Sequence, residues 1–378
     1  MTPSLHMPIP KLSACLRIAM LAPPWIEVPP PGYGGVENVV ALLCEAVVRH
    51  GHSVTLFAAP GSRSSATVRA MLDRPHPGDI GKSLYEADHV ARALADIDLA
   101  ARGRLPFDVI HDHSGFTALA MANRIATPMV HTIHGPFADD TRAFYSHHAH
   151  KAAMVALSRC QLAHAPEALM DAVVIPNPVA VEDWPFRSRK HDYLLWMGRI
   201  DADKGPHRAI DAARLAGRRL VLAGPVQPGH EEYFRTQIRP QIDGRRVSYV
   251  GEVGGSPRQE LFAGAAALLM PIRWPEPFGL VMVEALACGT PVISFPEGAA
   301  NDIVLDGENG FMVDDEVEMA HAVGRLDQID ARRCRTSVRS RFDVDQVARR
   351  YESVYLRSAG RLERRGEPLE AAFAAAKD

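Results

Sequence analysis

Residues 276–294 read Glu-Pro-Phe-Gly-Leu-Val-Met-Val-Glu-Ala-Leu-Ala-Cys-Gly-Thr-Pro-Val-Ile-Ser. The first proline and the first glycine favour a turn, and the apolar residues 280–288 favour a helix that ends at the second glycine. Residues 290–294 have the composition of a buried strand. The stretch therefore predicts a loop, a helix and a strand, with one carboxylate before the helix and one inside it.

The two carboxylates are spaced to serve a ligand that carries both phosphate and hydroxyl groups. Glu276 falls in the loop, and Glu284 lies about one turn inside the helix. Between them, an anion site is expected from the unpaired backbone N–H groups of Phe278, Gly279 and Leu280. Such a site can hold the diphosphate of a nucleotide sugar while the carboxylates accept hydrogen bonds from its hydroxyls. On spacing alone, a loop charge and a carboxylate favoured by the helix dipole remain the simpler interpretation.

Length and composition indicate a two-domain globular protein. The chain has 378 residues, more than one ordinary core accommodates, and 47% hydrophobic with 23% charged residues excludes a disordered or fibrous chain. A net charge of −3 gives no reason to expect nucleic-acid binding. Residues 331–378 carry 12 Lys and Arg against 7 Asp and Glu, so this segment could contact an anionic surface, although a solvated helix face is the simpler explanation.

The cysteines and the lengths of the apolar runs indicate in which cellular compartment the protein is expected. Five widely spaced cysteines favour buried thiols in a reducing cytoplasm. The first ten residues contain three prolines and no apolar segment of signal-peptide length, and no later run reaches the roughly 18 residues of a spanning helix. We therefore expect a cytoplasmic protein, with any contact to the inner face of a membrane being peripheral.

Strands and helices alternate along the chain in two series. Buried strands are expected at residues 16–21, 53–58, 107–111, 129–134, 153–157, 172–175, 193–198, 220–223, 265–272, 290–294 and 310–313. A linker rich in proline and charge, residues 177–191, separates the series. This order predicts an α/β protein of two Rossmann-like domains that face a cleft, residues 1–185 and 186–342, followed by residues 343–378, whose helix packs back across the cleft.

Two motifs for other ligands can be rejected. No G-x-G-x-x-G occurs, which argues against a dinucleotide fingerprint. The run Gly81-Lys82-Ser83 resembles the end of a phosphate-binding P-loop, but His76 occupies the position of its first glycine. Residues 63–82, rich in Ser, Pro and Gly, are therefore predicted to form a surface loop.

Two strand-to-helix loops are suited to phosphate. Gly34 and Gly35 lack a Cβ, so the backbone there can approach a ligand closely, although tight-turn glycines are the simpler reading. Arg199 and Lys204 follow the strand at 193–198 and could neutralise the charge that grows on a departing diphosphate. The base pocket is expected at the ends of the next two strands, from backbone groups of Gly224, Val250 and Gly251.

Histidines end two strands at the sheet edge where ligands of open α/β folds bind, namely His111, His113, His131 and His134, together with Asp112. A zinc site is one interpretation of this set. Strand alternation sends neighbouring side chains to opposite faces, and no Cys or Glu partner is indicated, so we expect no metal here.

Several of these motifs together resemble glycosyltransferase family 4, whose members are retaining enzymes with the GT-B fold. The resemblance covers nearly the whole chain and rests on the Gly-Gly-x-Glu loop at 34–37, Thr-Ile-His-Gly at 132–135, Gly-Arg-x(4)-Lys-Gly at 198–205, the E-x(7)-E signature at 276–284 and Asn-Gly-Phe at 309–311. One departure is Pro178, which replaces the glycine of the family's Pro-Asn-Gly-Val turn.

The resemblance implies transfer of a hexose from a nucleoside diphosphate sugar, UDP- or GDP-linked, to a hydroxyl acceptor with retention at the anomeric carbon. It places the acceptor in the amino-terminal domain and the nucleotide in the carboxy-terminal one. Catalytic roles are implied for His134, Arg199, Lys204 and Glu276. Donor-binding roles are implied for Gly34, Gly35, Gly224, Val250, Gly251, Phe278, Gly279, Leu280 and Glu284. A nucleotide-sugar epimerase and a non-catalytic nucleotide-sugar-binding protein are the alternatives, and the acceptor stays open.

Overall fold

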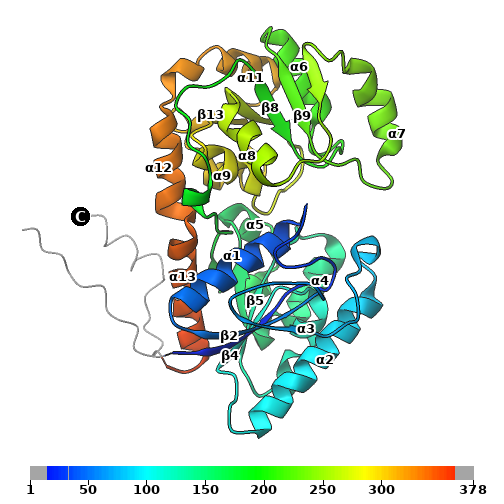
Figure 1. Cartoon of the computed structure of the whole chain (residues 1–378), viewed down its shortest axis with the longest axis vertical. Coiled ribbons are helices and arrows are strands. Elements are labelled where there is room, and N and C mark those ends of the chain that lie inside the picture. Colours follow the sequence, from blue (N-terminus) through cyan, green and yellow to red (C-terminus); the bar gives the residue numbers. More distant parts are fainter. Residues whose placement is uncertain (1–14, 33, 362–378) are drawn as a thin grey trace, which may run out of the picture.

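Two parallel β-sheets, one in each half of the chain, form the framework of the protein (Figure 1). The structure is a computed structural model that describes residues 15–32 and 34–361. The first sheet has the strand order β3-β2-β1-β4-β5-β6-β7, and the second has the order β10-β9-β8-β11-β12-β13. In each sheet the chain adds strands on one side of its first strand, β1 or β8, and then continues on the other side of that strand. This strand order is the one expected for a doubly wound α/β fold.

The first sheet contains β1 (Arg17–Leu21), β2 (Ser53–Ala58), β3 (Thr67–Ala70), β4 (Val109–Asp112), β5 (Met129–Thr132), β6 (Ala153–Ala156) and β7 (Val173–Val174). Its helices are α1 (Gly35–Arg49), α2 (Ser83–Arg102), α3 (Phe116–Met121), α4 (Asp139–His148) and α5 (Arg159–Ala163). Every residue of β4 and β5 is buried, because helices cover both faces of a parallel sheet.

The second sheet contains β8 (Leu194–Met197), β9 (Leu220–Ala223), β10 (Val247–Tyr249), β11 (Ala267–Met270), β12 (Val292–Ser294) and β13 (Gly310–Met312). Its helices are α6 (Pro206–Leu215), α7 (Glu231–Tyr233), α8 (Gly255–Gly264), α9 (Leu280–Ala287), α10 (Ala300–Ile303) and α11 (Glu316–Val323). A π-helical turn at Phe234–Ile238 continues α7. Short 3-10 turns lie at Pro77–Asp79, Ala122–Arg124, Ala149–Lys151, Glu167–Leu169, Val181–Asp183, Arg239–Gln241 and Leu326–Gln328.

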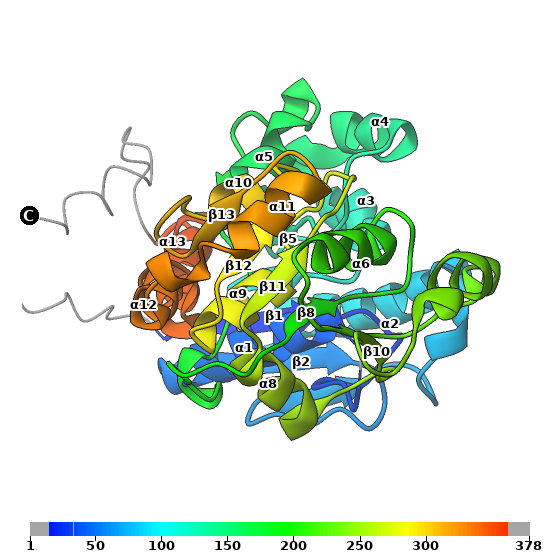
Figure 2. The same ribbon diagram turned by 90° about the horizontal axis from the view of Figure 1, so that it is seen from above.

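Two consecutive helices connect the halves along one side of the molecule (Figures 1 and 2). Helix α12 (Ala331–Phe342) packs against α9 of the second half, and α13 (Val344–Ser358) packs against α1 and β5 of the first half. At the junction, Val179 N–H donates to the carbonyl of Phe342 at 2.9 Å, and Val344 N–H donates to the carbonyl of Val179 at 3.0 Å. Helix α13 is thereby part of the core of the first half.

The predicted alternation of strands and helices is confirmed, with one correction. Residues 63–82, predicted as a surface loop, contain the edge strand β3, which pairs in parallel with β2 from Thr55↔Thr67 to Ala58↔Ala70. Three of its four residues are exposed, so the strand lacks the buried apolar pattern by which strands are detected from sequence. Among the described residues, no helix is long and apolar enough to cross a membrane.

Candidate functional site

A cavity of about 420 Å³ lies between the two halves of the molecule. The first half contributes the loop before α1 together with His134, Leu157 and Asn177. The second half contributes the ends of β8, β9 and β11, the loop before α8, and the start of α9. The carboxyl ends of parallel strands and helix N-termini are where open α/β folds bind ligands, so this cavity is the candidate site.

Helix α9 points its N-terminus at the cavity. Gly279 precedes the helix with φ of 85°, a left-handed conformation that glycine adopts without strain. Phe278, Gly279 and Leu280 all line the cavity, and the amide groups of a first helical turn have no acceptor within the helix. A Cβ built on Gly35 would contact Leu280 Cδ1 at 3.7 Å, so the glycine loop of the first half faces this helix end directly.

Lys204 and Glu276 form an ion pair inside the cavity. Both side chains are 14% exposed. Trp274 supports the pair, because its Nε1–H donates to Glu276 Oε2 at 2.8 Å while Lys204 Nζ lies 4.4 Å from the centre of its indole ring. Burial lowers the pKa of the Lys204 amine, and the neighbouring Glu276 carboxylate opposes that shift. The site therefore contains a buried cation held by one carboxylate and one aromatic face.

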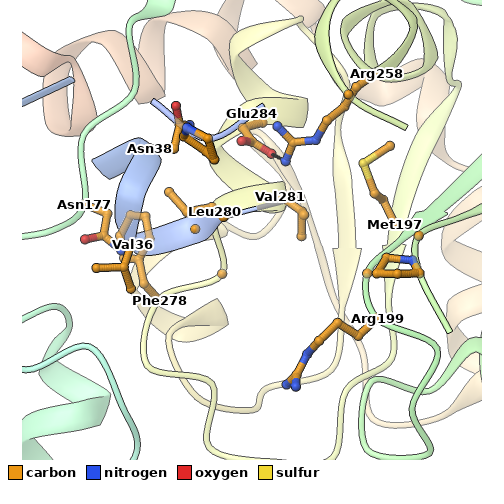
Figure 3. Close-up of a pocket in the computed structure, with 18 of the residues that line it drawn as sticks. Val36, Asn38, Asn177, Met197, Arg199, Arg258, Phe278, Leu280, Val281 and Glu284 are labelled. Carbon is orange, nitrogen blue, oxygen red and sulfur yellow. Dashed lines mark hydrogen bonds and ion pairs between the residues drawn. The ribbon is translucent and has the colours of Figure 1, made fainter. Parts of the chain in front are cut away.

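A second ion pair joins Glu284 of α9 to Arg258 of α8. Glu284 is buried, which raises the pKa of its carboxyl, and the Arg258 guanidinium counteracts the rise. Figure 3 shows this pair at one end of the pocket, with Arg199 at the other. The Arg199 guanidinium donates to the neutral Gln227 Oε1 at 3.2 Å and forms no ion pair within the described part of the chain.

Close backbone packing holds the loops that carry the cations. Gly224 has φ of 139°, and a Cβ there would lie 1.8 Å from the carbonyl oxygen of Gly198. Gly205 has φ of 72°, and its Cβ would lie 2.3 Å from the carbonyl oxygen of Pro271. These two glycines let the loop with Arg199 and Lys204 pack directly against the neighbouring strands.

The histidines at the edge of the first sheet form hydrogen bonds with one another and with nearby side chains. His131 Nδ1 pairs with Asp112 at 2.7 Å, and His113 Nδ1 lies 2.8 Å from His134 Nε2. Among residues 15–32 and 34–361, no group of three or more His, Cys, Asp or Glu side chains could hold a metal ion. His111 and His113 are two residues apart, so alternation along the chain places their rings on the same side, where the ring centres lie 3.9 Å apart.

Most of the predicted site residues meet in this cavity. The residues that line it are Gly34, Gly35, His134, Arg199, Lys204, Gly224, Glu276, Phe278, Gly279, Leu280 and Glu284. Val250 and Gly251, which were predicted for the base pocket, are not among the residues that line it. Val250 is 46% exposed, and the Gly251 carbonyl accepts the Gly224 N–H at 2.7 Å. The chain turns there, so that residues 252–255 reach the cavity instead.

Sequence reasoning missed two side chains of the cavity. Arg258 belongs to a helix with no recognisable motif. Only the burial of Glu284 indicates that this carboxylate needs a neighbouring cation. Asn177 lines the cavity with its buried Oδ1 unpartnered within the described chain, so it can offer an acceptor to a ligand. Its position in the Pro-Asn-Pro-Val turn was visible in the sequence, but the replacement of glycine by Pro178 obscured the signal.

Two family models match consecutive parts of the chain. Residues 33–183 match the model described as Glycosyltransferase Family 4. Residues 191–328 match the model described as Glycosyl transferases group 1. The first match begins after β1 and covers the remaining strands of the first sheet, and the second covers the second sheet, so that together they span most of the chain.

Curated relatives and solved structures agree with these models. A glycogen synthase of Mycobacterium tuberculosis is 29% identical, with 93% of this chain and 97% of the relative covered. A phosphatidyl-myo-inositol mannosyltransferase of Mycobacterium leprae is 28% identical over 90% of this chain and 97% of the relative. The crystal structure of AviGT4, a glycosyltransferase involved in avilamycin A biosynthesis, has a TM-score of 0.66 at 28% identity, covering 91% of this chain and 98% of AviGT4.

The fold is also shared with a more distant structure, Anabaena Alr3699/HepE in complex with UDP-glucose. It has a TM-score of 0.67 at 20% identity, with 90% of this chain and 99% of that one covered. The two sheets, the motifs that meet between them and the matches over both halves lead to one conclusion. The chain belongs to glycosyltransferase family 4 and is a glycosyltransferase with the GT-B fold.

Proposed function

We propose that the cavity binds a nucleoside diphosphate hexose, and that the enzyme transfers the hexose to a hydroxyl acceptor with retention of anomeric configuration. One observation carries this proposal: the cations Arg199 and Lys204, the N-terminus of α9, and the carboxylates Glu276 and Glu284 converge on a single cavity between the halves. A diphosphate requires the first two of these features, and sugar and ribose hydroxyls require the third. The nucleotide would lie on the second half, and the acceptor would approach from the first.

In this proposal Lys204 exchanges partners when the donor binds. Its ion pair with Glu276 neutralises both groups. A diphosphate carries more charge than one carboxylate, so it would draw the ammonium away and free Glu276 to accept a hydrogen bond from a sugar hydroxyl. Arg199, which has no carboxylate partner within the described chain, would bind the other side of the diphosphate.

The chemical step breaks the bond between the anomeric carbon and the diphosphate oxygen and forms a bond to the acceptor oxygen on the same face. The acceptor proton passes to the departing phosphate, so no separate general base from the protein is needed. Negative charge grows on the leaving diphosphate, where Arg199, Lys204 and the first turn of α9 stabilise it. Excluding water from the cavity would limit hydrolysis of the donor.

Donor binding is tested by calorimetric titration and thermal shift with UDP-glucose, GDP-mannose and ADP-glucose. UDP-glucose is the first choice because it is bound in the HepE structure of the same fold. We expect one nucleotide to raise the melting temperature, since a ligand that binds only the folded state stabilises it. Lys204→Ala should weaken binding by about 10- to 100-fold, the loss of one hydrogen bond between charged groups.

Lys82→Ala is the matched control. Lys82 belongs to the rejected P-loop-like run, pairs with Asp79 and is 65% exposed. The Lys82→Ala variant should bind every donor as the unmodified enzyme does. Equal binding by Lys204→Ala and Lys82→Ala would remove the cavity from consideration as the donor site.

A further inference from the structure

A tryptophan beside the cavity holds the carboxylate of Glu276. The indole Nε1–H of Trp274 donates to Glu276 Oε2 at 2.8 Å, and Lys204 Nζ donates to the same oxygen. Glu276 Oε2 thus accepts two hydrogen bonds, whereas Oε1 has no hydrogen-bond partner among residues 15–32 and 34–361. Because an indole N–H can only donate, the direction of the Trp274 bond is fixed.

The backbone around Glu276 is held in place, so the orientation of the side chain is what its partners determine. Glu276 N–H donates to the Trp274 carbonyl at 2.8 Å, and the Glu276 carbonyl accepts the N–H of Ala299 at 2.9 Å. Gly298 packs against the same backbone, since a Cβ on Gly298 would lie 2.4 Å from the Glu276 nitrogen. The indole N–H and the Lys204 ammonium are therefore the groups that orient the carboxylate.

The two partners of this oxygen differ in how easily they can move. Lys204 ends in an ammonium on a flexible four-carbon chain, and a diphosphate attracts it more strongly than one carboxylate does. Trp274 has a rigid, neutral ring that packs against the core of the second half. The residue before it is tied to the Lys204 loop, because Arg273 N–H donates to the Asp203 carbonyl at 2.9 Å. Trp274 can therefore remain on Glu276 when Lys204 leaves.

We propose that Trp274 is a positioning residue for recognition of the donor sugar. Its N–H holds Oε2 of Glu276 after Lys204 has turned to the diphosphate, so that Oε1 accepts a hydrogen bond from a hydroxyl of the hexose. The inference rests on the proposed function, which supplies the ligand. Because Trp274 acts through Glu276, loss of its N–H weakens binding of the sugar and leaves binding of the nucleotide unchanged.

Two substitutions separate the indole N–H from the aromatic face. Trp274→Phe keeps a ring beside Lys204 Nζ, which lies 4.4 Å from the indole centre, but removes the N–H. In Trp274→His, Nε2 has the same place in the five-membered ring as the indole Nε1, so the donor is kept while much of the aromatic face is lost. A role in packing alone makes phenylalanine the better replacement, whereas the proposal makes histidine the better one.

Isothermal titration calorimetry with UDP and UDP-glucose measures the effect, and GDP with GDP-mannose and ADP with ADP-glucose are the parallel pairs. Both variants should bind the nucleoside diphosphate within about twofold of the unmodified enzyme. The nucleotide sugar should bind about tenfold more weakly to Trp274→Phe, the loss of one hydrogen bond to a charged group. Its binding to Trp274→His should stay within about threefold of the unmodified enzyme.

A double-variant cycle shows whether Trp274 acts through Glu276. Glu276→Ala removes the carboxylate, so the addition of Trp274→Phe should change binding of the nucleotide sugar by less than about twofold. A second tenfold loss in the double variant would mean that Trp274 acts on the donor by another route, and it would overturn the proposal.

The unmodified enzyme separates this inference from the proposed function. If it binds no nucleotide sugar of the three pairs, the proposed function fails and the positioning role fails with it. If it binds one of them and Trp274→Phe binds that donor equally well, the positioning role alone is overturned. Weaker binding by Trp274→His than by Trp274→Phe overturns it too. Should Trp274→Phe not fold, Trp274→His must bind the donor more tightly than Glu276→Ala does, and equal binding by these two variants contradicts the proposal.

Discussion

At the scale of single residues, the site is built from charges that are buried in pairs. Glu284 is almost fully buried, so its carboxylate is tolerable only beside a cation, and Arg258 supplies it. Glu276 pairs in the same way with Lys204. Each carboxylate of the E-x(7)-E signature thus has its own basic partner from a different element. The signature predicted the carboxylates, but the partner of Glu284 could not be predicted, because contacts between distant elements leave no local pattern.

The Glu284 pair makes a testable contribution to stability. Arg258→Met should lower the free energy of unfolding by about 2 kcal/mol, because it leaves a buried carboxylate without its cation and raises the pKa of that carboxyl further. Urea unfolding measures the change. The double variant Arg258→Met/Glu284→Gln should recover part of the loss, since the two effects are coupled. Arg235→Met, which breaks an exposed pair with Glu232, should cost less than about 0.5 kcal/mol. Additive single and double variants would refute the coupling.

Buried histidines make stability depend on pH. Burial lowers the pKa of His89 to about 4, whereas an unfolded histidine titrates near 6.5. Below pH 6.5 the unfolded chain binds a proton that the folded chain does not, so folding stability falls as the pH drops from 6.5 towards 4. For His89 alone the loss between pH 8 and pH 5 is about 2 kcal/mol. His89→Leu should flatten this dependence, and His147→Leu at an exposed position should not. Unfolding curves at several pH values measure it, and equal slopes in the two variants would contradict it.

At the scale of elements, strands and helices with buried apolar faces were predictable and exposed ones were not. Strand β9 was predicted at its observed bounds, Leu220–Ala223, because three of its four residues are buried. Strand β3 was missed because it lies at an edge and faces solvent. The cavity is lined by residues 252–255 and not by Val250 and Gly251, because the chain turns at Gly251, whose carbonyl accepts the Gly224 N–H in a contact that no sequence pattern encodes.

Glycine geometry gives a prediction at this scale. Gly224→Ala should lower the melting temperature strongly and displace the Arg199 loop, because its Cβ would lie 1.8 Å from the Gly198 carbonyl oxygen. Gly217→Ala is the control, with φ of 65° and nothing within 4 Å of the added Cβ. It carries only the cost of the left-handed backbone, about 1 kcal/mol. Equal effects of the two substitutions on thermal unfolding would show that the close backbone approach is relaxed in solution.

At the scale of the whole molecule, the described part of the chain crosses between its halves twice, and helix α13 completes the first core. Val347, Tyr351 and Tyr355 of α13 are buried against residues from α1 and the first sheet. The same helix places the Tyr355 hydroxyl 2.6 Å from Nδ1 of the buried His111. Helix α13 is therefore in contact with the buried histidines of the first sheet, an arrangement that the resemblance alone could not have predicted.

A charge in this interface should destabilise the first half selectively. Val347→Asp buries a carboxylate at a fully buried position and should shift the calorimetric unfolding of the first half down, leaving a separate transition for the second half. Gln346→Asp, at the adjacent exposed position, is the control and should unfold as the unmodified protein does. A Val347→Asp variant that unfolds in one unshifted transition would contradict the packing of α13.

The most direct measurement of the central claim is a crystal structure of the enzyme with UDP-glucose bound. We expect the diphosphate between Arg199, Lys204 and the first turn of α9, with Lys204 turned from Glu276 to a phosphate oxygen. Glu276 would then lie against a sugar hydroxyl and Glu284 near the ribose. A nucleotide bound elsewhere would show that this cavity is not the donor site, and a nucleotide bound here with the Lys204–Glu276 pair unbroken would show that Lys204 does not exchange partners.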